Sequence, residues 1–155
     1  MTPPAVHAGC LILGTCGILI RGAAGSGKSF LADSLIEAAR SRGSLGRLVA
    51  DDYVQLDAED GRLLAAVPET IRGRMEIRGL GLVEVRHEPR AHVRLIVDLL
   101  PMDRLERLPD EPLGEERLSG VSLPVLRCPE NDPGASLRLI RWAMRRLLPG
   151  IPDYI

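Results

Sequence analysis

Hydrophobic and polar residues follow a strand, loop and helix pattern along the first quarter of the chain. Two apolar runs, residues 6–13 and 17–21, are joined by a Gly-Thr-Cys turn and predict two strands. A glycine-rich segment comes next, and residues 28–41 then carry Leu31, Leu35, Ala38 and Ala39 at helical spacing. The order of these elements is typical of an α/β protein.

The rest of the chain continues with short apolar runs between turn signals. The predicted strands are residues 48–50, 53–56, 63–67, 83–86, 93–99 and 123–128, with a hairpin turn at Asp60 and Gly61 and a short helical turn at Pro68 and Glu69. Residues 101–124 are charged and hold four prolines, so this segment is expected to be mostly loop, with room for one turn of helix. A last helix is predicted over residues 135–148. Residues 1–155 are therefore expected to form one α/β domain with a mixed central sheet.

Composition narrows the class of protein. With one Trp, one Phe and two Tyr, the core is expected to be aliphatic. A formal net charge of −1 gives no overall field toward nucleic acid or a membrane surface, so neither is an expected partner. The three cysteines form no CxxC pair, which argues against a disulfide framework or a zinc site. The chain has neither a signal-peptide pattern nor an apolar run of membrane-spanning length, and the expected location is the cytoplasm.

Residues 22–29 carry the most specific motif in the chain. They read Gly22, Ala23, Ala24, Gly25, Ser26, Gly27, Lys28 and Ser29, and fit G-x-x-x-x-G-K-[ST] at every fixed position. Glycines let backbone amides turn inward around phosphates, and the start of the following helix adds partial positive charge there. Lys28 is expected to reach the β- and γ-phosphates, and the Ser29 hydroxyl to ligate Mg²⁺. The segment therefore predicts a P-loop that binds a nucleoside triphosphate.

Two adjacent acids, Asp51 and Asp52, are candidates for the carboxylates that phosphoryl transfer also requires. They follow the predicted strand 48–50, at the end where parallel sheets place their chemistry. One carboxylate can face the metal and the other the incoming hydroxyl, and the sequence does not order these two roles. The chain has no guanine-specifying NKxD pattern, which disfavours a GTPase.

A third segment, from Glu76 to Gly81, reads Glu-Ile-Arg-Gly-Leu-Gly. Taken alone, such paired glycines more often mark a bend at a strand edge than a site. Together with the P-loop and the acid pair, however, the segment resembles the catalytic domain of HPr kinase/phosphorylase. This bacterial enzyme phosphorylates a serine of the phosphocarrier HPr and can reverse the reaction with inorganic phosphate. The resemblance extends from His7 to the 123–125 region, and implies the nucleotide-binding core shared with phosphoenolpyruvate carboxykinase.

The resemblance implies a role for each matching residue. Lys28 would hold phosphates of ATP, and Mg²⁺ would be bound by Ser29, Glu76 and Asp51. Asp52 is favoured as the base that accepts the serine proton, with Asp51 as its partner. His7 matches an active-site histidine of the family, and Arg104 matches an arginine placed near the transferred phosphate.

The resemblance also sets the expected partners and the alternatives. The acceptor would be an HPr-like phosphocarrier of a phosphotransferase system, and a homo-oligomer, a hexamer by resemblance, is left open. The chain is expected to be a short form without the family's N-terminal domain, and residues 132–136 replace an Arg-Pro-Gly-Arg-Asn stretch linked to dephosphorylation. The reverse reaction is therefore also left open. The alternatives are a nucleotide-sensing module without catalysis and, less favoured, a small-molecule kinase.

Overall fold

The computed structural model describes residues 3–155. The elements in this part of the chain are the strands β1 (Ala5–His7), β2 (Gly9–Leu13), β3 (Cys16–Arg21), β4 (Gly46–Ala50), β5 (Tyr53–Glu59), β6 (Arg62–Ala66), β7 (Arg74–Ile77), β8 (Gly81–Glu84), β9 (Arg90–Leu100), β10 (Gly114–Leu118) and β11 (Val121–Pro129), the helices α1 (Lys28–Ser41) and α2 (Pro133–Leu147), and the 3₁₀ turns η1 (Glu69–Ile71) and η2 (Met102–Arg104). The predicted helices at 28–41 and 135–148 are confirmed, as are the predicted strands at 17–21, 48–50, 63–67 and 93–99.

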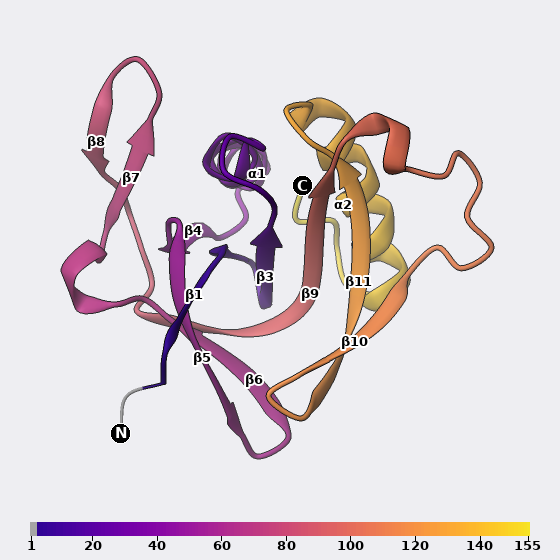
Figure 1. The fold of residues 1–155 in the computed structure, drawn as a ribbon, viewed down its shortest axis with the longest axis horizontal. Coiled ribbons are helices and arrows are strands. Elements are labelled where there is room, and N and C mark those ends of the chain that lie inside the picture. The colour runs from indigo at the N-terminus through magenta and orange to yellow at the C-terminus, as the bar shows by residue number, and fades with distance from the viewer. Residues whose placement is uncertain (1–2) are drawn as a thin grey trace.

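The large sheet is mixed, as expected for this α/β fold. Its strand order is β1-β5-β6-β9-β3-β2-β4, and β11 joins β9 and carries β10 at its other edge. β3 and β11 both run parallel to β9, whereas the other pairings of this sheet are antiparallel. The sheet curls strongly, and α1 and α2 lie beside each other against the central strands (Figure 1). The β7–β8 hairpin stands apart from this sheet, next to α1.

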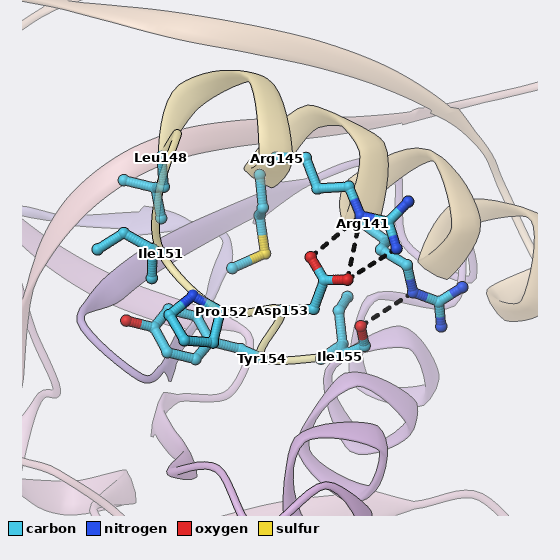
Figure 2. Close-up of a pocket in the computed structure, with 9 residues that line it drawn as sticks. Arg141, Arg145, Leu148, Ile151, Pro152, Asp153, Tyr154 and Ile155 are labelled. Carbon is cyan, nitrogen blue, oxygen red and sulfur yellow. Dashed lines mark hydrogen bonds and ion pairs between the residues drawn. The ribbon is translucent and has the colours of Figure 1, made fainter.

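The segment after α2 folds back against the helix and the β2–β3 turn. Arg145 donates to both carboxylate oxygens of Asp153, and Arg141 Nε donates to Ile155 O (Figure 2). The Tyr154 hydroxyl lies 3.2 Å from Thr15 Oγ1. The cavity between this segment and α2 holds about 10 Å³, which is room for about one water molecule. We therefore regard this cavity as part of the packing and not as a binding site.

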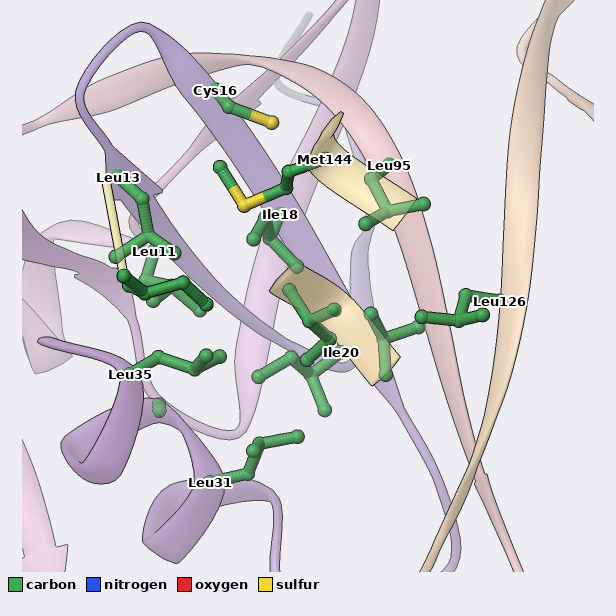
Figure 3. Packing of buried hydrophobic residues seen from close by; sticks show 14 of the residues in the cluster. Leu11, Leu13, Cys16, Ile18, Ile20, Leu31, Leu35, Leu95, Leu126 and Met144 are labelled. Carbon is green, nitrogen blue, oxygen red and sulfur yellow. The ribbon is translucent and has the colours of Figure 1, made fainter. Parts of the chain in front are cut away.

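Two aliphatic cores lie on opposite faces of the sheet, because successive strand residues point to opposite sides. Ile18 and Ile20 of β3 pack with Leu31 and Leu35 of α1 in the first core (Figure 3). Leu19, between those two isoleucines, belongs to the second core on the curled face. The expected aliphatic core is confirmed. Neither α1 nor α2, the helices within residues 3–155, is long and apolar enough to cross a membrane.

The three cysteines are free and belong to these cores. Cys10, Cys16 and Cys128 are all buried. Burial raises the pKa of these thiols to about 12, about 11 and about 12 respectively. Since the thiolate is the reactive form, these side chains act as small apolar residues.

The predicted loop over residues 101–124 contains the single helical turn that the prediction allowed, η2, but it was wrong in part because it also contains the strand β10. β10 pairs antiparallel with β11 through a turn at Ser119 and Gly120, both of which have positive φ. The sequence of β10, Gly-Glu-Glu-Arg-Leu, has no apolar alternation, because β10 is an edge strand whose side chains are largely exposed. The first predicted strand also divides at Ala8 into β1 and β2, and the strand expected at 83–86 is β8, which ends at Glu84.

Gly17 allows β3 to approach β9 closely, and its substitution should destabilise the fold. A Cβ at this position would lie 2.3 Å from the backbone oxygen of His92 on β9. Since backbone cannot give way without separating the two strands, we expect Gly17→Ala to lower the free energy of unfolding by about 2–3 kcal/mol in a urea titration. Gly114→Ala on β10 is the matched control, because its Cβ would lie 3.8 Å from the nearest atom, Val125 O. An equal loss of unfolding free energy in both variants would show that the close approach of β3 to β9 is not the cause.

Candidate active site

The glycine-rich loop lies between the carboxyl end of β3 and the start of α1, as the motif predicts. Gly25 and Gly27 have φ values of 80° and 92°, in the left-handed region where glycine carries no steric penalty. The Lys28 side chain is buried against the loop, and its Nζ donates to Gly22 O at 3.1 Å and Ala23 O at 3.2 Å. The loop therefore holds one ammonium group at the amino end of a helix, which is an arrangement suited to an anion.

Asp51 connects the loop to the strands around it. Its Oδ1 accepts from the Ser29 hydroxyl at 2.6 Å, and its Oδ2 accepts from the backbone N–H of Glu76 at 2.9 Å. Ser29 is in the first turn of α1 and Glu76 is on β7, so one carboxylate joins three separate segments. A serine hydroxyl beside a carboxylate is a set of hard oxygen donors that fits Mg²⁺.

Asp52 faces a different neighbour, although it is adjacent to Asp51 in the chain. Its φ of 71° is left-handed, and this bend turns the chain from β4 into β5. Its Oδ1 lies 2.7 Å from His7 Nε2, and its backbone oxygen accepts from Ala8 N at 2.9 Å. The Asp52 side chain is 56% exposed. Asp51 is thus held by the loop, whereas Asp52 is directed with His7 toward solvent.

The remaining predicted residues are less closely connected. The side chain of Glu76 is exposed on β7, and only its backbone N–H bonds to Asp51. Arg104 lies in η2, after the carboxyl end of β9, which is the edge of the sheet that also carries the loop because β3 and β9 are parallel. Within residues 3–155, no hydrogen bond or ion pair links the Arg104 side chain to Asp51, Asp52 or Lys28, and no group of three or more His, Cys, Asp or Glu is placed to hold a metal ion.

Sequence reasoning missed an ion-pair network directly before the loop. Arg21, the last residue of β3, donates to both oxygens of Asp98 on β9 at 2.7 and 2.9 Å. It also donates to the Glu116 carboxylate on β10. These hydrogen bonds from Arg21 hold the pKa of Glu116 below its ordinary value. The sequence shows them only as three charged residues, one on each of three strands, at separations too long for a local pattern.

Removing the Glu116 charge should destabilise the protein at neutral pH but not in acid. A lowered pKa in the folded state means that ionised Glu116 adds stability above its ordinary value of 4.5, and that this is lost as the pH falls through the folded-state pKa. We expect Glu116→Gln to cost about 1 kcal/mol at pH 7, because the pair is partly exposed, and the difference from the unsubstituted chain to shrink below about pH 4. Glu106→Gln, in the exposed 101–113 segment, is the control for urea titrations across this range. A difference in unfolding free energy that does not change with pH would contradict a stabilising role for the ionised Glu116.

Sequence comparisons relate the chain to a known family of proteins. A family model described as HPr Serine kinase C-terminal domain matches residues 2–145. The chain is 34% identical over 146 residues to the HPr kinase/phosphorylase of Geobacillus thermodenitrificans, covering 88% of this chain and 45% of that relative. It is 37% identical over 153 residues to the enzyme of the same name from Xylella fastidiosa, covering 84% and 43%. The chain thus spans less than half the length of these curated relatives.

The fold also matches a solved structure. The structure described as that of the Hpr(Ser) kinase/phosphatase from Coxiella burnetii superimposes with a TM-score of 0.77 at 27% identity. The match covers 93% of this chain and 92% of that one. The curled mixed sheet with two helices is therefore an architecture that a solved protein of this kind shares.

Proposed function

Because this chain belongs to the family of HPr serine kinase C-terminal domains, we propose that it is a protein serine kinase, which transfers the γ-phosphoryl group of ATP to an HPr-like phosphocarrier. The observation that carries the proposal is that the two acids have different contacts. Asp51 bonds to Ser29 of the loop, and Asp52 points with His7 toward solvent. A base that is exposed beside a phosphate-binding loop suits an acceptor that is itself a folded protein.

The nucleotide side of this site consists of residues 22–29 and Asp51. Backbone amides of the loop and the Lys28 ammonium would hold the phosphates. Ser29 and Asp51, already 2.6 Å apart, would hold Mg²⁺ together with the exposed side chain of Glu76. When bound, the metal would supply positive charge against the negative charge that develops on the phosphates during transfer. Mg²⁺ usually keeps several waters, so few protein ligands suffice.

The acceptor side consists of Asp52, His7 and Arg104. The serine oxygen forms the new bond to the γ-phosphorus as the bond to ADP breaks, and the serine proton passes to the Asp52 carboxylate. His7, 2.7 Å from Asp52, orients that carboxylate. Arg104 extends from the same edge of the sheet and would approach the transferred phosphoryl group.

Other parts of the proposal concern the reverse reaction and the assembly. In the reverse reaction an oxygen of inorganic phosphate would bond to the phosphorus of phosphoserine as the bond to the serine oxygen breaks, which gives pyrophosphate, and Asp52 would return its proton to the serine oxygen. The names of the curated relatives include a phosphorylase. A homo-oligomer, a hexamer by family resemblance, and a location in the bacterial cytoplasm with the phosphocarrier complete the proposal. The assembly and the location can each be tested apart from the kinase reaction, and light scattering measures the assembly.

The decisive experiment is to incubate the pure protein with Mg·ATP and the HPr-like protein of the same organism, and to search the acceptor for phosphoserine by mass. The controls are the same acceptor with its modified serine changed to alanine, and the same mixture with EDTA. Nucleotide binding without phosphoserine would reject the kinase in favour of a nucleotide-sensing module. Phosphate transferred to small alcohols or nucleosides in competition with the acceptor would instead indicate a small-molecule kinase.

A further inference from the structure

The turn between β11 and α2 contacts the glycine-rich loop from outside the sequence motif. Asn131 in this turn has a left-handed φ of 53°. Its side-chain Nδ2 donates to Gly25 O at 3.0 Å, and its backbone N–H donates to Ser26 O at 2.9 Å. One residue therefore holds two successive carbonyl oxygens of the loop, although it is 106 positions from Gly25 in the chain.

These two bonds fix the direction in which the loop amides point. In a planar trans peptide the N–H points opposite to the C=O. With Gly25 O held by Asn131, the Ser26 N–H points the other way, and it donates to Ala23 O at 3.0 Å. With Ser26 O also held by Asn131, the Gly27 N–H points away from Asn131 in the same manner. Asn131 thereby sets two successive peptide planes of the segment expected to surround phosphates.

The packing around this contact is tight. A Cβ at Gly27 would lie 2.9 Å from Asn131 Oδ1. A Cβ at Gly22 would lie 2.5 Å from Ser26 Oγ, which is itself buried. Gly27 is therefore needed for the close approach of the loop to Asn131, and Gly22 for the close approach of the loop to its own Ser26 side chain. Both requirements exist apart from any that a ligand imposes.

Capping of α2 does not account for the Asn131 side chain. Asp132 performs that function, since its Oδ1 accepts from Ala135 N at 3.1 Å. Asn131 itself is exposed, so burial does not require it to find a partner. Its amide is nevertheless directed at the loop, one residue before the helix cap.

We infer that Asn131 is a positioning residue of the phosphate-binding loop, which it holds in the conformation that directs the Gly27 N–H toward a bound nucleotide phosphate. The inference rests on the proposed function in one respect, that the loop binds a nucleotide. It does not depend on whether the phosphoryl group reaches serine.

Two variants of Asn131 separate the side-chain contact from the backbone turn. Asn131→Gly keeps the left-handed φ and the N–H bond to Ser26 O, and removes only the amide donor to Gly25 O. Asn131→Asp keeps the shape, but places carboxylate oxygens against Gly25 O and near the phosphates. Asp60→Gly is the matched control, because Asp60 has the same φ of 53° in the β5–β6 turn.

The experiment is calorimetric titration of each variant with Mg·ADP, well below its melting temperature. We expect Asn131→Gly to raise the Kd about threefold to tenfold, Asn131→Asp to raise it further, and Asp60→Gly to leave it unchanged. The binding stoichiometry should stay at the value of the unsubstituted protein. If Asn131 had a merely structural role, its substitution would lower the fraction of molecules that bind Mg·ADP and leave the Kd of the rest unchanged. An unchanged Kd in both Asn131 variants overturns the inference. If the unsubstituted protein binds Mg·ADP and forms no phosphoserine, the kinase proposal fails while this one stands; if it does not bind Mg·ADP, both fail.

Discussion

Asp52→Asn is expected to lower the turnover number for serine phosphorylation by about 10²- to 10⁴-fold, the range that a general base contributes. The amide retains the size of the side chain but cannot accept the serine proton. Asparagine is also among the few residues that tolerate the left-handed φ of 71° at this bend, so the turn from β4 into β5 should persist. Nucleotide affinity should stay within about threefold, because Lys28 and Asp51, not Asp52, contact the loop.

The measurement is a single-turnover assay with radiolabelled ATP and excess acceptor, with Mg·ADP affinity determined in parallel. Asp57→Asn, on the exposed part of β5, is the control for loss of one negative charge. Asp51→Asn tests the order of the pair: its amide oxygen can still accept from Ser29, but loss of the negative charge should raise the Mg²⁺ concentration that the reaction requires and lower its rate. A normal rate in Asp52→Asn would reject it as the base. A changed Mg²⁺ dependence in Asp52→Asn alone would reverse the two roles.

The part of the site that the sequence predicted is the part that is contiguous in the chain. Strand 17–21, the loop and helix 28–41 follow one another, so a local motif and its periodicity define them together. The acid pair was also placed correctly at the end of a strand. What the sequence could not order was which acid faces the loop. That distinction depends on the left-handed backbone of Asp52, a conformation that no side-chain pattern in the sequence predicts.

The contacts that the sequence could not predict join segments far apart in the chain. Asn131 reaches Gly25 across 106 positions, and Arg21 reaches Glu116 across 95. Both depend on the parallel pairing of β9 with β3 and β11, which brings the carboxyl ends of three strands to one edge. The same applies to Glu76: its distance from Asp51 follows from where the β7–β8 hairpin packs beside α1, which strand periodicity does not determine.

Lys28→Ala should have the second large effect, on nucleotide affinity. Lys28 is the only lysine in the sequence, where the other fixed cations are arginines. Its ammonium is a compact point charge with three donors, two of which now bond to Gly22 O and Ala23 O. Its loss removes the direct charge contact to the phosphates, so we expect the Kd for Mg·ATP to rise on the order of 100-fold and the turnover number to fall by at least as much.

Because there is a single lysine, the same residue can also be observed directly. Reductive methylation with ¹³C-formaldehyde retains the charge and labels only Lys28 and the terminal amine, so the two resonances report the site and an internal control. The dimethylated ammonium keeps its charge and one N–H donor, so added Mg·ATP should shift the Lys28 signal as that donor moves from a loop carbonyl to phosphate, and leave the terminal signal in place. Lys28→Met matches the length of the side chain without its charge, and should bind Mg·ATP as weakly as Lys28→Ala. If Lys28→Met bound Mg·ATP normally, with no shift of the labelled lysine in the unsubstituted protein, the ammonium would have no part in holding the nucleotide, and the contacts with Gly22 and Ala23 would be structural alone.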